Sequence, residues 1–137
     1  MSALNHALER LRALTEPVSN PGQRATLSDI ESIQQKTARR FPSHLIHFLL
    51  ETGDLSFGAI EPITVMDPTA HTHFTEVLVN FRAINGPETL IPICEDNGNF
   101  YCIQRDGTVV FWDHNGPVDE SWPDMANWIT DVWIASD

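Results

Sequence analysis

Apolar residues recur every three or four positions near the start of the chain, which is the spacing of one face of an α-helix. This pattern predicts an amphipathic helix over residues 3–15 with its apolar face at Leu4, Ala7, Leu8, Leu11 and Leu14. The stretch "PVSNPGQ" follows and is typical of a loop, because proline, glycine and asparagine interrupt regular structure. We therefore expect residues 1–26 to form a helix and linker, and residues 27–137 to form the main domain.

Two further helices are predicted on either side of a proline. Ser28 and Glu31 have the spacing of a capping box, in which a hydroxyl and a carboxylate satisfy amide groups left free at a helix start. Pro42 is expected to end this helix, because its ring lacks an amide hydrogen and clashes with the preceding turn. The segment "SHLIHFLLET" then predicts another helix that stops at Gly53.

The residue types change after this helical pair. Apolar and β-branched residues mixed with Gly58 and Pro62 predict an irregular edge strand over residues 57–65. The segment from Phe74 to Ile84 fits a helix and also alternates like a strand, and we favour the helix.

Two dipeptides give the clearest local signal in the chain. "NG" at residues 97–98 and "DG" at residues 106–107 are preferred in type I′ hairpins, where both central residues need a positive φ. They predict a three-stranded antiparallel meander. If both loops have two residues, one face carries Ile93, Cys102 and Phe111, and the other carries Cys94, Tyr101 and Trp112. A sheet apolar on both faces must be covered on both or offer one to a partner.

The C-terminal segment "SWPDMANWITDVWIA" predicts a helix that Ser121 can cap and that covers one face of this sheet. Its apolar positions at helical spacing are Trp122, Met125, Ile129, Val132 and Trp133. The pattern as a whole therefore predicts a single α+β domain with a mostly antiparallel twisted sheet flanked by helices.

Charge is distributed unevenly along this pattern. The formal net charge is -11, yet residues 1–50 hold six Lys/Arg and four Asp/Glu, whereas residues 51–137 hold two and fifteen. An acidic field repels phosphate backbones and anionic lipid, so nucleic acid and membrane are not expected partners. No signal-like or membrane-spanning segment is seen and two cysteines are too few for a secreted disulfide framework, so we expect a cytoplasmic protein.

Candidate chemistry is sparse. His71, His73 and Glu76 in "HTHFTE" offer metal ligands, but their spacing fits no helical zinc motif of the HExxH kind. Cys94 and Cys102 are expected to be buried thiols on opposite faces of the sheet rather than a redox pair. No nucleophile with an oriented base and no phosphate-binding glycine loop is recognised. We assign no catalytic, cofactor-binding or metal-binding residues and expect no enzyme and no cofactor.

The order of two longer segments carries a family resemblance. The chain reads "LSDIESIQQKTARRFPSHLIHFLLETGD" and later "LIPICEDNGNFYCIQRDGTVVFWDH", followed by a tryptophan-rich C-terminal segment. Over about residues 27–134 this order resembles the SUKH superfamily, the Smi/Knr-like proteins. The matching positions are Phe41, Pro42, Phe48, Leu49, Ile91, Pro92, Tyr101, Cys102, Trp112, Asp113 and His114. The chain departs from the pattern at Leu45, where tyrosine is usual, at Gly53 and Asp54, and at the "DNG" turn that replaces three glycines.

The resemblance implies a SUKH-like α+β fold and, for bacterial members, a cytoplasmic immunity protein that binds and blocks a polymorphic toxin such as a nuclease or deaminase. We expect a monomer or weak dimer whose acids face a basic patch on the cognate toxin. A non-catalytic regulatory adaptor of the same fold is the main alternative, and a metal-dependent hydrolase is a further one. The residues expected to bind the partner are Asp54, Glu61, Glu95, Asp96, Trp112, Asp113, Asp119, Glu120 and Trp122.

Overall fold

A computed structural model describes residues 2–17 and 22–137, so residues 18–21 of the predicted linker lie outside the described residues. The helices are α1 (Ala3–Leu14), α2 (Leu27–Thr37), α3 (Ser43–Thr52), α4 (Phe74–Ala83) and α5 (Met125–Trp128), the last continuing into a π-helical turn (Ile129–Trp133) and a 3-10 turn (Ile134–Ser136). The strands β1 (Ile91–Asp96), β2 (Asn99–Ile103), β3 (Val109–Asp113) and β4 (Gly116–Trp122) form one antiparallel sheet in that order. The predicted α+β class is confirmed. Among the described residues no helix has the length and apolar character needed to cross a bilayer.

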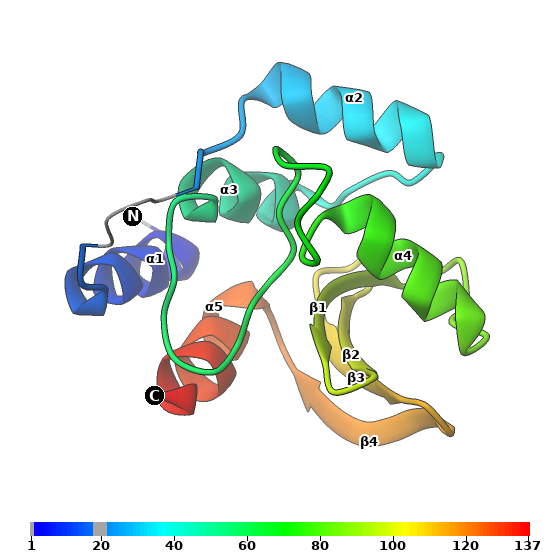
Figure 1. Ribbon diagram of the computed structural model, residues 1–137. Coiled ribbons are helices and arrows are strands. Elements are labelled where there is room, and N and C mark those ends of the chain that lie inside the picture. The colour runs from blue at the N-terminus through cyan, green and yellow to red at the C-terminus, as the bar shows by residue number, and fades with distance from the viewer. Residues whose placement is uncertain (1, 18–21) are drawn as a thin grey trace.

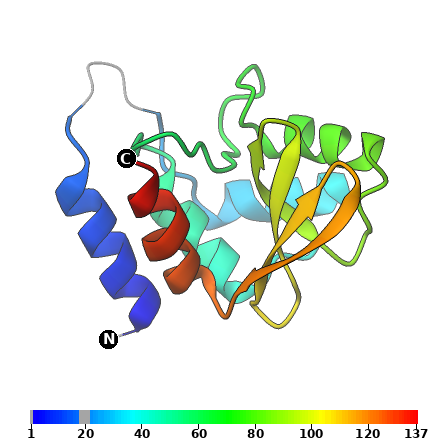
Figure 2. The ribbon, with the colours of Figure 1, turned by 90° about the horizontal axis from the view of Figure 1, so that it is seen from below.

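The helices are arranged unequally around the sheet. In Figure 1, α4 lies across one face of β1, β2 and β3, while α1, α3 and α5 form a group beside the sheet. Figure 2 views the same molecule from below, with the strands in front of α4 and α2 and no helix in front of the strands. One face of the sheet is thus covered by α4, and much of the other is not covered by a helix.

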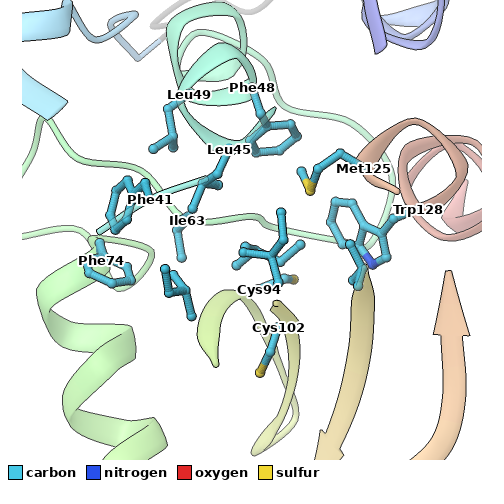
Figure 3. Close-up of a cluster of buried hydrophobic side chains, with 14 of the residues drawn as sticks. Phe41, Leu45, Phe48, Leu49, Ile63, Phe74, Cys94, Cys102, Met125 and Trp128 are labelled. Carbon is cyan, nitrogen blue, oxygen red and sulfur yellow. The ribbon is translucent and has the colours of Figure 1, made fainter. Parts of the chain in front are cut away.

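A single hydrophobic core joins these elements. Figure 3 shows Leu45 and Phe48 reaching down from α3, and Met125 and Trp128 reaching in from α5. α1 contributes Leu4, Leu8 and Leu11 to the same core and packs on α5 and α3. The packing of α1 does not decide whether residues 1–26 and 27–137 are separate units of the chain, so that division stays a prediction.

The caps of α2 differ from the predicted ones. Thr26 and Asp29, rather than Ser28 and Glu31, form the capping box, with the Thr26 hydroxyl accepting from the Asp29 amide at 3.2 Å and the Asp29 carboxylate accepting from the Thr26 amide at 2.9 Å. The spacing is the same, but the helix begins two residues earlier than predicted, and Ser28 lies inside it.

The prediction that Pro42 ends α2 was wrong. Ala38 adopts a left-handed conformation with φ 54°, and the Arg39 amide donates to the Gln34 carbonyl at 3.1 Å, which closes the helix four residues before the proline. Pro42 instead stands at the N-cap position of α3, whose predicted span of residues 43–52 is confirmed. The predicted helix at residues 74–84 is also confirmed as α4.

The first hairpin forms as predicted and the second does not. Asn97 and Gly98 both have positive φ in a two-residue loop, and Asp96 pairs with Asn99. In the second hairpin only Gly107 has positive φ, because the Asp106 side chain accepts the Thr108 amide and holds a three-residue loop between paired residues 104 and 108.

The longer loop changes which side chains share a face. β3 slips by one position, so Phe111 pairs with Tyr101 rather than facing Cys102, and Trp112 pairs with Phe100 rather than joining Tyr101. The register also shifts between Pro92 and Cys94. Cys94 still pairs with Tyr101, so Cys94 and Cys102 lie on opposite faces as predicted, and both are buried free thiols.

Three other expectations are corrected. Residues 57–65 form isolated bridges rather than a strand, although Pro62 bridges to Cys94 and so lies along the outer edge of β1. β4 is an unpredicted fourth strand and contains both Ser121 and Trp122. The C-terminal helix therefore begins later, and the side chain of Asp124, not Ser121, accepts the Asn127 amide at its start.

Candidate partner-binding surface

An acidic cleft lies between α4, the loop before it and the β1–β2 hairpin. The pocket has a volume of about 370 Å³. Its lining includes four carboxylates but no lysine or arginine: Glu61, Glu76, Glu95 and Asp96. Three of these were expected to bind a partner from the sequence, and the fold brings them together.

Local structure explains how the cleft is built. The His73 ring accepts the Thr75 amide at 3.2 Å and so caps the start of α4, which presents Glu76 and Asn80 one turn apart toward the cleft. The Asn97–Gly98 turn places Asp96 at the opposite wall. Asn80, which the sequence analysis missed, donates to Glu95 at 2.9 Å. No local pattern marks this position, because Glu95 lies fifteen residues away in the sequence.

The histidines of "HTHFTE" have separate roles. His71 is exposed and contacts Glu61 across the cleft rim. His73 is buried, and burial lowers its pKa, which is the direction expected when the charged imidazolium loses hydration. Among the residues that the structure describes, no three such side chains gather as a metal-binding group.

The second group of expected site residues lies on β3 and β4. Asp119 and Glu120 are exposed on β4, which forms one edge of the sheet. Asp113 accepts the Asn115 amide at 2.7 Å and shapes the β3–β4 turn. Its neighbour His114 lies 3.0 Å from the Asn99 side-chain oxygen, so the Asp113–His114 pair serves this turn.

Aromatic contacts assign the two expected tryptophans to opposite faces. Trp112 packs against Phe81 of α4 with ring centroids 6.3 Å apart, and its indole nitrogen is buried without a hydrogen-bond partner among the described residues. Trp122 packs against Tyr101 at 5.5 Å on the other face. Of the two, only Trp122 is available to a partner on the side away from α4.

The uncovered side of the sheet is termed the open face and is defined by Asp96, Tyr101, Phe111, Glu120 and Trp122. The rings of Tyr101 and Phe111 lie 4.8 Å apart across β2 and β3. Burial, together with the charges of Asp96 and Glu120, raises the pKa of Tyr101 to about 12. Tyr101 and Phe111 were not predicted to share a surface, because a two-residue second loop would place them on opposite faces.

Asp54 lies apart from both groups. Its carboxylate accepts two hydrogen bonds from Arg12 of α1, at 2.9 and 3.1 Å, and a weaker one from Arg24 at 3.3 Å. The hydrogen bond from Arg12 holds the pKa of Asp54 below its usual range. This acid therefore ties α1 to the end of α3 and is not grouped with the cleft or the open face.

The cysteines are chemically quiet. Burial raises the pKa of Cys94 to about 12 and raises that of Cys102 as well. A thiol that stays protonated is a poor nucleophile and a poor metal ligand. The two thiols therefore pack in the core, as expected.

The fold and the acidic surfaces define a small α+β protein with a helix-flanked antiparallel sheet of the SUKH type. The family described as SMI1-KNR4 cell-wall, SUKH_5, matches residues 4–134, and the chain belongs to this family. A crystal structure of a protein from Pseudomonas syringae pv. tomato is 35% identical, with a TM-score of 0.91 over 96% of this chain and 99% of that one. A comparison with curated proteins gives no match.

Proposed function

We propose that this protein is an immunity protein, which binds a cognate toxin and neutralises it by stoichiometric protein–protein contact. Membership of the SMI1-KNR4 family supports this proposal, because the resemblance to bacterial SUKH proteins implies this role. The proposal also assigns the protein to the cytoplasm, where such a toxin acts.

The charge of the strands indicates which kind of partner the protein binds. The four strands hold five acids, Glu95, Asp96, Asp113, Asp119 and Glu120, and neither lysine nor arginine. Excess charge of one sign destabilises a compact fold through self-repulsion, whereas a partner of opposite charge relieves it and is drawn in faster. A toxin with a basic surface, such as one that binds nucleic acid, has the complementary charge.

The test is co-expression with a candidate toxin encoded by a neighbouring gene. We expect this protein to restore growth and to elute with the toxin as a complex of fixed stoichiometry in size-exclusion chromatography with light scattering. Association is expected to slow by about tenfold or more between low and high salt, because charge steering is screened. Growth arrest despite full expression of this protein would contradict the proposal. Purification with a different host protein would instead favour a regulatory adaptor.

A further inference from the structure

The acids of the open face lie beside aromatic rings, and one of them, Asp96, also lines the acidic cleft at the end of β1. In the cleft, Glu61 contacts His71 and Glu95 accepts a hydrogen bond from Asn80. On the open face, Glu120 has no hydrogen-bonding or ion-pair partner among the described residues, and Asp96 has only a 3.5 Å contact from the neighbouring Asn97. Both carboxylates beside the aromatic rings are therefore free to pair with a cation from another molecule.

The aromatic residues of the open face form a connected row. Tyr101 contacts Phe111 at 4.8 Å and Trp122 at 5.5 Å, and it rests on the fully buried Trp128 of α5 at 5.5 Å. Trp128 fixes the tyrosine ring from below, while Tyr101, Phe111 and Trp122 all remain partly accessible. A rigid aromatic row needs little ordering when a ligand arrives, which favours binding.

No basic side chain of the strands competes for this surface. The two cationic residues after position 50 are Arg82, on the helix that covers the opposite face, and Arg105, in the β2–β3 loop. A guanidinium or ammonium group is attracted to an aromatic face and to a carboxylate at once. The open face offers both without an internal cation to occupy them.

We propose that the open face binds a basic, extended segment of the toxin and seats an arginine or lysine side chain over Tyr101 and Trp122, between Asp96 and Glu120. This inference rests on the proposed function and names the surface and the chemistry of the partner. An extended segment suits a sheet face better than a helix does, because its alternate side chains reach down to successive rows of the sheet.

A labelled peptide, acetyl-(Arg-Thr)4-amide, tests the surface without the toxin. The variant Asp96→Lys/Glu120→Lys is compared with Glu9→Lys/Glu31→Lys, which changes the net charge equally on exposed positions of α1 and α2. We expect the first pair to raise the Kd of the peptide by at least about tenfold and the second by less than about threefold, because close charges outweigh distant screened ones. Equal effects of both pairs would overturn the inference.

The ring itself is tested at Tyr101. Tyr101→Phe keeps the aromatic face and is expected to bind as the native protein does, whereas Tyr101→Leu is expected to weaken binding by about threefold or more. Thermal unfolding of each variant shows whether it is folded. If Tyr101→Leu does not fold, the charge variants alone test whether the open face binds the peptide. Weakening by Tyr101→Phe equal to that by Tyr101→Leu would refute a role for the ring.

Toxin co-expression separates this inference from the proposed function. If the native protein rescues growth and Asp96→Lys/Glu120→Lys rescues it equally well, the function stands and the open face is not the interface. If the peptide maps to the open face and the native protein fails to rescue, the surface binds basic segments and the immunity function is wrong. If Asp96→Lys/Glu120→Lys loses rescue and Glu9→Lys/Glu31→Lys keeps it, both the immunity function and the open-face interface are supported.

Discussion

The ion pair between Arg12 and Asp54 gives a quantitative test of how α1 is held on the domain. Arg12 donates one hydrogen bond to each carboxylate oxygen of Asp54, and it also donates to the Glu51 carbonyl at 2.7 Å. The side chains of Arg12 and Asp54 are 38% and 27% exposed, so solvent screens part of their attraction. Replacing Asp54 by asparagine removes the charge and leaves nearly the same shape.

The expected loss follows from this geometry. Hydrogen bonds to charged groups contribute about 1.5–3 kcal/mol when protected, and exposed ion pairs contribute at most about 1 kcal/mol. For a pair of intermediate exposure we expect Asp54→Asn to lower the free energy of unfolding by about 1–2 kcal/mol at pH 7. For a domain of this size that lowers the Tm by roughly 3–7 °C.

The pH dependence gives the loss a signature. Because the pKa of Asp54 is lowered in the folded state, its stabilising contribution is complete above the ordinary aspartate pKa near 4. It disappears as pH falls through the lower folded-state pKa, where the carboxylate takes up a proton. The difference between the native protein and Asp54→Asn should therefore be constant from pH 7 to about 5 and shrink toward zero in strong acid.

Urea unfolding followed by tryptophan fluorescence measures these differences, with Asp131→Asn as the control. Asp131 is exposed and is not in an ion pair of the described residues, so its substitution is expected to change stability by less than about 0.5 kcal/mol. A double-mutant cycle with Arg12→Met isolates the pair. A coupling energy near zero, or equal effects of Asp54→Asn and Asp131→Asn, would refute the reasoning.

Three further predictions concern the core and its buried polar groups. Leu11→Ala, at a fully buried position of α1, should cost about 2–5 kcal/mol and keep unfolding cooperative; a second transition would mean that α1 unfolds separately. Cys94 and Cys102 should react with a thiol reagent at pH 8 only after denaturation, because burial raises the pKa of both thiols. Rapid reaction of the native protein would contradict their burial. The pKa of His73 is lowered in the folded state, which therefore favours the neutral imidazole, so the free energy of unfolding should fall as pH drops from 7 to 5. The fall should be smaller in His73→Asn, which retains a side chain able to cap α4. Equal pH dependence of the two proteins in urea unfolding would argue against this role of His73.

Helices were the part of the fold most readily predicted from sequence. The apolar stripes of α1 and α3 are regular, and the segment of α4 fits a helix as well as a strand; each gave a helix within about one residue of the observed bounds. Errors arose at the ends, where two equivalent capping spacings overlap at Thr26 and Ser28. A side-chain pattern does not distinguish them, because Thr26 with Asp29 and Ser28 with Glu31 have the same spacing.

The sheet was predicted only in part, for a physical reason that concerns loops. An "NG" dipeptide fixed the first loop, but at "DG" the Asp106 side chain favours a three-residue loop, and a one-residue change moves every side chain of β3 relative to β2. β4 has few apolar residues and is mostly exposed, so its pattern resembles that of a loop. These two features decide which aromatic rings share the open face.

The sequence by itself determined the class of fold, the family resemblance, the burial of the two thiols and the concentration of acid after residue 50, because these depend on residue type and local spacing. The tertiary structure alone decided how the acids are used. It placed Asp54 against Arg12 of a distant helix, brought Glu61 and Glu95 to one cleft, and aligned Tyr101 with Phe111 and Trp122. Such contacts join residues far apart in sequence, and their partners are chosen by the packing of whole elements rather than by any local pattern.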